Sequence, residues 1–260
     1  YVSYVRLARR WVYVASVVLA GFATVLQSAS GLYTSPIGAQ WLILAALTVL
    51  TGSFTIKVPS VTARISVSET FVFASVLLFG AAAGTLTVLL ETLIISFWRK
   101  PQEPLHRLMF NIAAPAFSIW LSGTIFFWLS GIRPLSEEAT TLGVLFLPLA
   151  VLTVSYFLLN SWLVAVALGL ERQQPPGTIW WNNFTWVSLN YFSGASLAAL
   201  VVTYTRDLEL STLVVIVPLL FISYLTFKIA MQRVEDSNRH LSELNGLYLS
   251  TIETLAMAID

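Results

Sequence analysis

The amino-acid sequence predicts an all-α fold, a polytopic bundle of transmembrane helices followed by a cytoplasmic signalling helix. Hydrophobic residues make up 57% of the 260 residues, and the mean hydropathy is +0.80. Charged residues make up 10%, well below the roughly 25% of ordinary soluble domains. Apolar segments follow one another up to residue 230, where the pattern becomes amphipathic. We therefore expect an integral membrane protein with a sensor bundle at 1–230 and a connector or coiled-coil helix at 231–260.

The apolar segments give the expected number of membrane spans. A helix needs roughly 20 apolar residues to cross a bilayer. The third and fourth segments are short and meet at the run from Gly80 to Gly84, so they either stop near mid-membrane beside a binding site or pack as a tight hairpin. About eight candidate spans follow from this measure: 11–30, 38–56, 66–82, 84–98, 108–130, 142–169, 179–204 and 211–230.

The distribution of basic residues predicts the orientation. Of the 14 lysines and arginines, all but Arg133 and Arg206 fall on one side of the eight-span arrangement. Lysine and arginine are enriched in cytoplasmic loops of membrane proteins. We therefore expect a multi-pass protein of the bacterial inner (cytoplasmic) membrane, in contact with the lipid bilayer, with both termini in the cytoplasm.

Two glutamates interrupt the apolar segments. Glu91 lies about two helical turns before Arg99 and Lys100, at a depth where an unpaired carboxylate is costly. It is either buried and bonded to a neighbouring helix or to Arg64, or it handles a ligand or a proton. Glu69 follows Ser68 at the start of its segment and fits a helix N-cap, with its carboxylate favoured by the helix dipole.

Several other polar or aromatic residues lie inside apolar runs. Interhelical hydrogen bonds, worth about 0.6–2 kcal/mol each, explain the asparagines most simply. The alternative is that these residues line a ligand pocket together with the two glutamates. The predicted ligand-binding residues are Glu69, Glu91, Asn111, Trp120, Asn160, Asn190 and Tyr191, with Ser118 and Trp186 beside them.

The sequence also argues against several functions. Cysteine is absent, which excludes disulfides and thiol catalysis, and His106 and His240 belong to no cluster with metal-ligand spacing. Phosphate-binding loops, dinucleotide fingerprints, zinc-protease motifs and nucleophile elbows are missing. Basic residues are scattered at the membrane edges rather than gathered on one face, which argues against nucleic-acid binding. We predict no catalytic residue, metal ligand or cofactor within these residues.

The segment after residue 230 reads as a helix with an imperfect apolar seam. An imperfect seam of this kind suits a connector helix, because two alternative packings against a partner helix would differ in free energy by only a few kcal/mol. We therefore expect a homodimer whose paired helices relay a signal, although a surface helix packed on its own protomer would show the same pattern. The predicted relay residues are Val234, Leu241, Leu244, Tyr248 and Leu255.

The last fourteen residues, 247–260, read Leu-Tyr-Leu-Ser-Thr-Ile-Glu-Thr-Leu-Ala-Met-Ala-Ile-Asp. This run resembles the helix that opens HD-type phosphohydrolase domains, especially those of the HD-GYP class. The resemblance implies an output domain that hydrolyses cyclic di-GMP with divalent metal ions. Its metal ligands would lie beyond Asp260, so the resemblance assigns none to this chain.

A second resemblance lies upstream. The run from Ile65 to Phe73, continued by Leu78-Phe79-Gly80 and Gly84, is similar to vitamin-binding membrane subunits of energy-coupling-factor transporters. Those subunits have about six spans and no long cytoplasmic exit helix. This resemblance implies binding or transport of a small solute.

These observations together predict the membrane sensory and dimerisation region of a bacterial signalling protein. The bundle would detect a small apolar or amphipathic ligand, or a state of the membrane, and relay it to a C-terminal HD-type phosphohydrolase, a cyclic di-GMP phosphodiesterase that is not included in the chain. The alternatives are a membrane protein that binds or transports a small solute and a structural subunit of a larger membrane assembly.

Overall fold

The computed structural model describes residues 2–34, 38–53, 56–57, 64–65, 68–98, 104–137 and 142–204, and in the C-terminal part 225, 228–229, 232–237 and 239–250. Nearly all of them are helical. The elements are α1 (Val2–Thr34), α2 (Ala39–Ser53), β1 (Ile56–Lys57), β2 (Arg64–Ile65), α3 (Glu69–Phe79), α4 (Ala81–Trp98), α5 (Leu105–Ser130), α6 (Leu142–Arg172), α7 (Pro176–Phe184), the short 3-10 helix η1 (Thr185–Val187) and α8 (Ser188–Tyr204). The two-residue strands β1 and β2 pair antiparallel.

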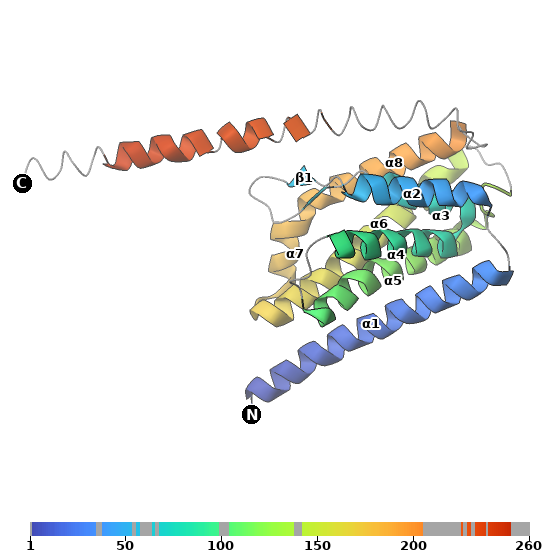
Figure 1. The fold of residues 1–260 in the computed structure, drawn as a ribbon, viewed down its shortest axis with the longest axis horizontal. Helices are drawn as coiled ribbons and strands as arrows, with labels where there is room; N and C mark the ends of the chain where they lie inside the picture. Colours follow the sequence, from blue (N-terminus) through green and yellow to red (C-terminus); the bar gives the residue numbers. More distant parts are fainter. Residues whose placement is uncertain are drawn as a thin grey trace, which may run out of the picture.

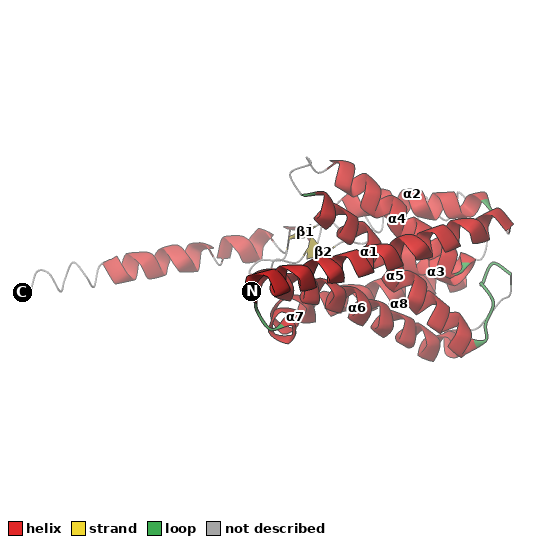
Figure 2. Ribbon diagram, turned by 90° about the horizontal axis from the view of Figure 1, so that it is seen from below, coloured by secondary structure: helices red, strands yellow, loops and turns green. Residues whose placement is uncertain are grey.

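The helices form one bundle around α3 (Figure 1). Nine of the eleven residues of α3 are buried, because this helix is apolar on all sides and packs against α2, α4 and α8. Helix α1 lies along one side of the bundle, across α4, α5 and α6 (Figure 2). Helices α1 and α5 begin, and α6 ends, at the same end of the bundle, which we call the charged end because Arg10, Arg107 and Glu171 meet there.

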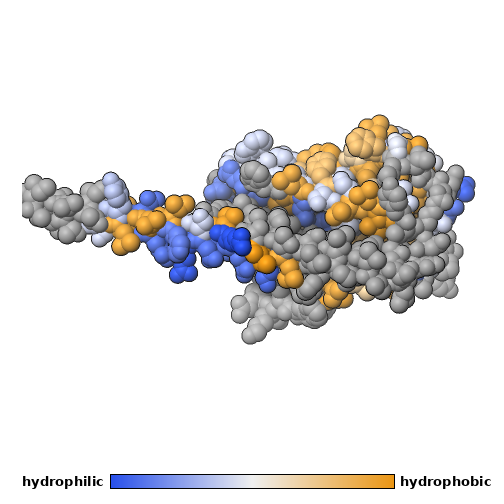
Figure 3. All heavy atoms as spheres, turned by 90° about the horizontal axis from the view of Figure 1, so that it is seen from above, coloured by the Kyte–Doolittle hydropathy of each residue, from blue (hydrophilic) through white to orange (hydrophobic). Residues whose placement is uncertain are grey.

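The outer surface of the bundle is apolar, as expected in lipid. Large hydrophobic side chains such as Leu19, Trp128 and Phe146 are 70%, 82% and 78% exposed. Figure 3 shows apolar side chains over the bundle, whereas charged side chains interrupt them on the C-terminal helical segment. This distribution fits helices that face a bilayer.

Three helical segments are long and apolar enough to cross a membrane: Ala8–Leu32, Leu105–Ser130 and Gly143–Arg172. Helices α7 and α8 make a fourth if the bent pair counts as one span. The candidate spans at 38–56, 66–82 and 84–98 correspond to shorter apolar helices, so a count of eight is not confirmed, and most of the candidate at 211–230 lies outside the described residues.

The seventh candidate span is not a straight helix. A 56° bend separates α7 from α8. The side chains of Asn183, Thr185 and Ser188 all donate hydrogen bonds to backbone carbonyls one turn earlier, at 2.6–2.8 Å. Such local bonds compete with the regular helical pattern and commonly bend helices. A cluster of polar residues within a predicted span therefore marks the break.

The third and fourth candidate spans form a packed hairpin. Gly80 ends α3 with φ +94°, a conformation that glycine adopts without strain. A Cβ atom at Gly84 would overlap the side chain of Val76, so the two helices approach as closely as glycine permits. Residues after α5 close the hairpin, because the backbone N–H groups of Leu135 and Ser136 donate to the last carbonyls of α3. The two segments therefore pack as the tight hairpin that was one of the two expected arrangements.

Candidate ligand-binding site

Glu69 lies in the first turn of α3, beside the N-cap residue Ser68. The sequence predicts Glu69 to be the N-cap, but the structure places Ser68 in that position and Glu69 immediately after it. Ser68 makes no side-chain capping hydrogen bond, and its side chain bonds to the carboxyl group of Glu91 instead. The start of α3 is thereby tied to the middle of α4. Glu69 keeps its favourable place at the positive end of the helix dipole.

Two glycines make room for the glutamates inside the bundle. A Cβ atom at Gly52 of α2 would overlap the carboxylate of Glu91, and one at Gly194 of α8 would lie 3.0 Å from the Cβ atom of Glu69. Glu69 and Glu91 are close enough to repel each other electrostatically. Two acidic side chains from successive helices therefore share one interior region, bounded by α2 on one side and α8 on the other.

Aromatic and amide side chains of α6 and α8 complete this region. The side-chain NH₂ of Asn160 donates a 2.9 Å hydrogen bond to the hydroxyl of Tyr191, and the ring of Tyr191 lies 5.2 Å from that of Tyr156. Both tyrosine hydroxyls are within electrostatic range of Glu69 and Glu91. We call Glu69, Glu91, Tyr156, Asn160 and Tyr191 the acidic–aromatic cluster.

The cluster contains hydrogen-bond acceptors that nothing satisfies. Among the described residues, five buried side-chain nitrogen or oxygen atoms have no hydrogen-bonding partner, and two of them are Glu69 Oε2 and Asn160 Oδ1. Within that same part of the chain, no ion pair joins Glu69 or Glu91 to a basic side chain. Buried polar atoms are nearly always hydrogen-bonded, so an orphan acceptor needs an explanation such as a bound molecule. The cluster therefore holds two buried acceptors that no donor among the described residues reaches.

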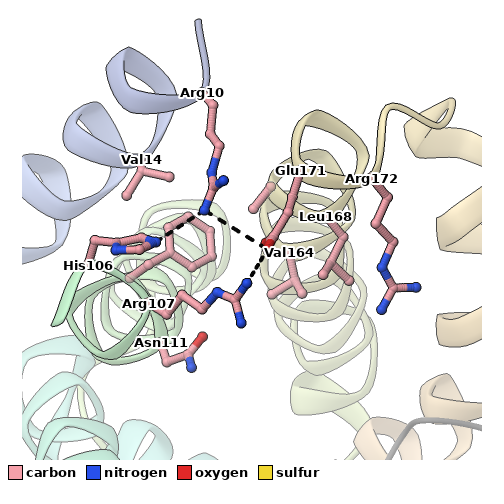
Figure 4. A pocket seen from close by; sticks show the side chains of 11 residues that line it. Arg10, Val14, His106, Arg107, Asn111, Val164, Leu168, Glu171 and Arg172 are labelled. Atoms are coloured by element: carbon pink, nitrogen blue, oxygen red, sulfur yellow. Dashed lines mark hydrogen bonds and ion pairs between the residues drawn. The ribbon is translucent and has the colours of Figure 1, made fainter. Parts of the chain in front are cut away.

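The structure separates the predicted site residues into two groups. Glu69, Glu91, Asn160 and Tyr191 come together in the cluster, from four different helices. Asn111 is exposed and lies apart from the cluster, where it lines a pocket at the charged end (Figure 4). The roles of all five residues in ligand binding stay predictions.

Two other predicted residues face elsewhere. Trp120 is half-buried on α5, a helix that contributes no residue to the cluster. Asn190 is half-buried and precedes Tyr191, and successive helical side chains point about 100° apart. Ser118 is buried and donates to the carbonyl of Ala114 in its own helix, while the side chain of Trp186 lies outside the described residues.

Four of the five relay residues lie on the C-terminal helical segment. Val234, Leu241, Leu244 and Tyr248 are all exposed, from 45% to 69%, and Leu255 lies outside the described residues. This segment, helical over 232–237 and 239–250, extends beyond the charged end of the bundle in Figure 1. The apolar stripe is therefore uncovered within the described protomer.

Sequence reasoning missed Tyr156, Ser68 and the two glycines of the site. Tyr156 sits in a run of apolar and hydroxyl residues, where its burial could not be distinguished from that of the neighbouring Phe157. Gly52 and Gly194 did carry a signal, since glycine inside an apolar helix commonly marks a close approach. Which side chain approaches each glycine could not be read from the sequence.

Changing Tyr191 to Phe tests the hydrogen bond across α6 and α8. We expect Tyr191→Phe to lower the free energy of unfolding by about 0.6–2 kcal/mol, because the amide of Asn160 loses its acceptor. Thermal unfolding in detergent, followed by circular dichroism, measures the change. Tyr4 precedes the spanning part of α1 and provides the control Tyr4→Phe. Equal melting temperatures for both variants and the unchanged protein would contradict this bond's contribution.

The chain was also compared with known proteins. Residues 33–231, about three quarters of the chain, match the family model MASE9. The chain is also similar to a solved structure described as the S component of a bacterial ECF transporter, with 14% identity, a TM-score of 0.35 and coverage of 64% of this chain and 88% of that one. No curated protein matches it. The matched residues include every member of the acidic–aromatic cluster, and the chain belongs to MASE9, a family of membrane-associated sensory domains.

Proposed function

We propose that this chain is the sensory and dimerisation region of a bacterial signalling protein, and that its acidic–aromatic cluster binds a small amphipathic ligand. Membership of a membrane-associated sensory family supports a sensor. The single observation that carries the ligand site is the pair of neighbouring glutamates, in which one buried carboxylate oxygen of Glu69 has no hydrogen-bonding partner among the described residues.

The chemistry of the cluster defines the ligand class. The unsatisfied acceptors on Glu69 and Asn160 require hydrogen-bond donors, and a positively charged ligand would stabilise the ionised form of the two adjacent carboxyl groups. Aromatic rings of Tyr156 and Tyr191 stand beside them and offer faces for a cation or an apolar group. A small organic amine or a similar donor-rich cation with an apolar part satisfies all three features.

The signal would leave the bundle through the C-terminal helix. The exposed stripe of Val234, Leu241, Leu244 and Tyr248 fits a partner helix, and a second protomer would supply one with the same pattern. A ligand shifts the output only by its difference in affinity between two states of the bundle. The paired C-terminal helices could pack along their imperfect apolar seam in two ways, and each packing would correspond to one state of the bundle.

The proposed orientation and output complete this model. The charged end would face the cytoplasm of the bacterial inner membrane, following the positive-inside distribution. The output domain would be an HD-type phosphodiesterase for cyclic di-GMP with bound divalent metal ions, as the resemblance of residues 247–260 suggests. The family match ends at residue 231, where the charged helix follows.

The variant Glu91→Gln tests the proposed function. In cells that carry the full-length protein, we expect it to change the cyclic di-GMP level at least severalfold, because the amide supplies a donor that mimics occupancy of the site. The level is measured by mass spectrometry of cell extracts and normalised to the amount of protein in the membrane. The exposed residue Glu137, in the loop after α5, provides the control Glu137→Gln. An unchanged cyclic di-GMP level in Glu91→Gln would remove Glu91 from sensing.

A further inference from the structure

A pocket lies at the charged end, between α1, α5 and α6 and apart from the acidic–aromatic cluster (Figure 4). Its volume is about 270 Å³. One wall is apolar and includes Val14, Phe110 and Val164. The polar residues that line it are Arg10, His106, Arg107, Asn111, Glu171 and Arg172. None of these residues belongs to the acidic–aromatic cluster.

The pocket has an excess of positive charge. Arg107 forms an ion pair with Glu171, and Arg10 approaches the same carboxylate oxygen at 4.0 Å. Arg10 also lies 3.1 Å from Nε2 of His106. Two guanidinium groups thus converge on a single carboxylate, whereas Arg172, the third arginine that lines the pocket, points away from Glu171 in Figure 4.

The basic and apolar parts of the pocket follow one another along the helix axes. Along α1, Arg10 precedes Val14 by one turn, and along α5, Arg107 precedes Phe110 by nearly one turn, so the basic groups lie toward the charged end and the apolar wall toward the middle of the bundle. Arg10 and Arg107 are 26% and 48% exposed, so their guanidinium groups remain accessible to an incoming group. A phospholipid has the same order, with its phosphate at the boundary and its chains inside.

We propose that this pocket binds a phosphate-bearing anion, and that Glu171 occupies the anion position when the ligand is absent. Paired guanidinium groups suit phosphate oxygens, because each offers several fixed N–H donors. Basic pockets between transmembrane helices commonly hold lipid headgroups. The apolar wall favours an anionic phospholipid over a soluble phosphate, and the inference is independent of the function proposed for the acidic–aromatic cluster.

The test measures binding to the whole 260-residue chain in detergent by native mass spectrometry. Phosphatidylglycerol is compared with phosphatidylcholine of the same acyl chains, with and without inorganic phosphate. We expect phosphatidylglycerol to bind more tightly, and Arg10→Gln or Arg107→Gln to weaken its binding about tenfold by removing a charge-assisted contact. Arg9→Gln is the matched control, because Arg9 is exposed, neighbours Arg10 and does not line the pocket.

A second variant acts in the opposite direction. We expect Glu171→Gln to tighten phosphatidylglycerol binding severalfold, because the internal competitor for Arg10 and Arg107 loses its charge. Misfolding does not produce such a gain. Binding of inorganic phosphate that depends on Arg107, with no preference between the lipids, would support the anion site and assign it to a soluble phosphate.

Two results would overturn the proposal. One is binding to Arg10→Gln and Arg107→Gln that equals binding to the unchanged chain. The other is an equal loss in Arg9→Gln, which would show that the lipid responds to net charge alone.

Discussion

Replacing Gly21 by leucine is expected to loosen the whole of α1 from the bundle. Gly21 is buried, and a Cβ atom there would lie 2.5 Å from the carbonyl oxygen of Ala113 and 2.6 Å from its Cα atom. Both are backbone atoms of α5, which cannot turn aside as a side chain would. We expect Gly21→Leu to lower the free energy of unfolding by about 3 kcal/mol, the upper part of the usual range for overpacking.

The same helix provides the control. Gly31 has no atom within 4 Å of the position of a Cβ atom, so Gly31→Leu should leave the stability almost unchanged. Thermal unfolding in detergent compares the two variants. Equal melting temperatures would mean that α1 does not approach α5 as closely as the structure shows.

This prediction extends to the charged end. Helix association within a membrane depends on close packing at small residues, because lipid chains are as apolar as the helix surfaces. Arg10 belongs to α1, whereas the other polar residues that line the pocket at the charged end belong to α5 and α6. Loosening α1 should therefore weaken phosphatidylglycerol binding as well, while Gly31→Leu should not.

The second large effect is expected at Glu69, where a substitution should stabilise the protein. Glu69 Oε2 is buried without a hydrogen-bonding partner among the described residues, and Glu91 repels the carboxylate. Glu69→Gln keeps the shape of the side chain, removes the repulsion and adds an N–H donor close to the carboxyl group of Glu91. We expect the free energy of unfolding to rise by about 1–3 kcal/mol, the usual cost of a buried unsatisfied group.

The measurement is again thermal unfolding in detergent, with Glu137→Gln as the control for loss of one negative charge. A melting temperature for Glu69→Gln at or below that of the unchanged chain would show that the carboxylate is already satisfied. A gain in stability together with loss of signalling would be typical of a functional site, where binding groups are kept at a cost to the fold. A gain in stability combined with a loss of signalling would therefore distinguish a ligand site from a purely structural hydrogen-bond network.

The helices were predicted correctly from the sequence where the environment of a residue depends on its neighbours along the chain. The candidate span 108–130 is mostly apolar and lies within the single helix α5, and the small residues from Gly80 to Gly84 mark the hairpin of α3 and α4. The sequence was a poorer guide at Asn183, where side-chain bonds to the backbone interrupt the candidate span 179–204. Hydropathy averages over a window and does not register such local competition.

The candidate sites show the same division. Glu69 and Glu91 stood out because a carboxylate in an apolar segment is costly at any depth, so the sequence by itself determined that they needed a partner or a role. The sequence also determined the membrane class and, through the absence of cysteine, the absence of thiol chemistry. Each of these properties is local or compositional.

Only the tertiary structure decided which polar residues meet. It brought Asn160 and Tyr191 to the two glutamates and placed Asn111 in a separate pocket with Arg10 and Arg107. The physical reason is that helix packing fixes the rotation and the depth of each helix against its neighbours. Close approaches at Gly52 and Gly194, far apart in the sequence, set that packing around the glutamates, and no pattern within a single helix encodes it.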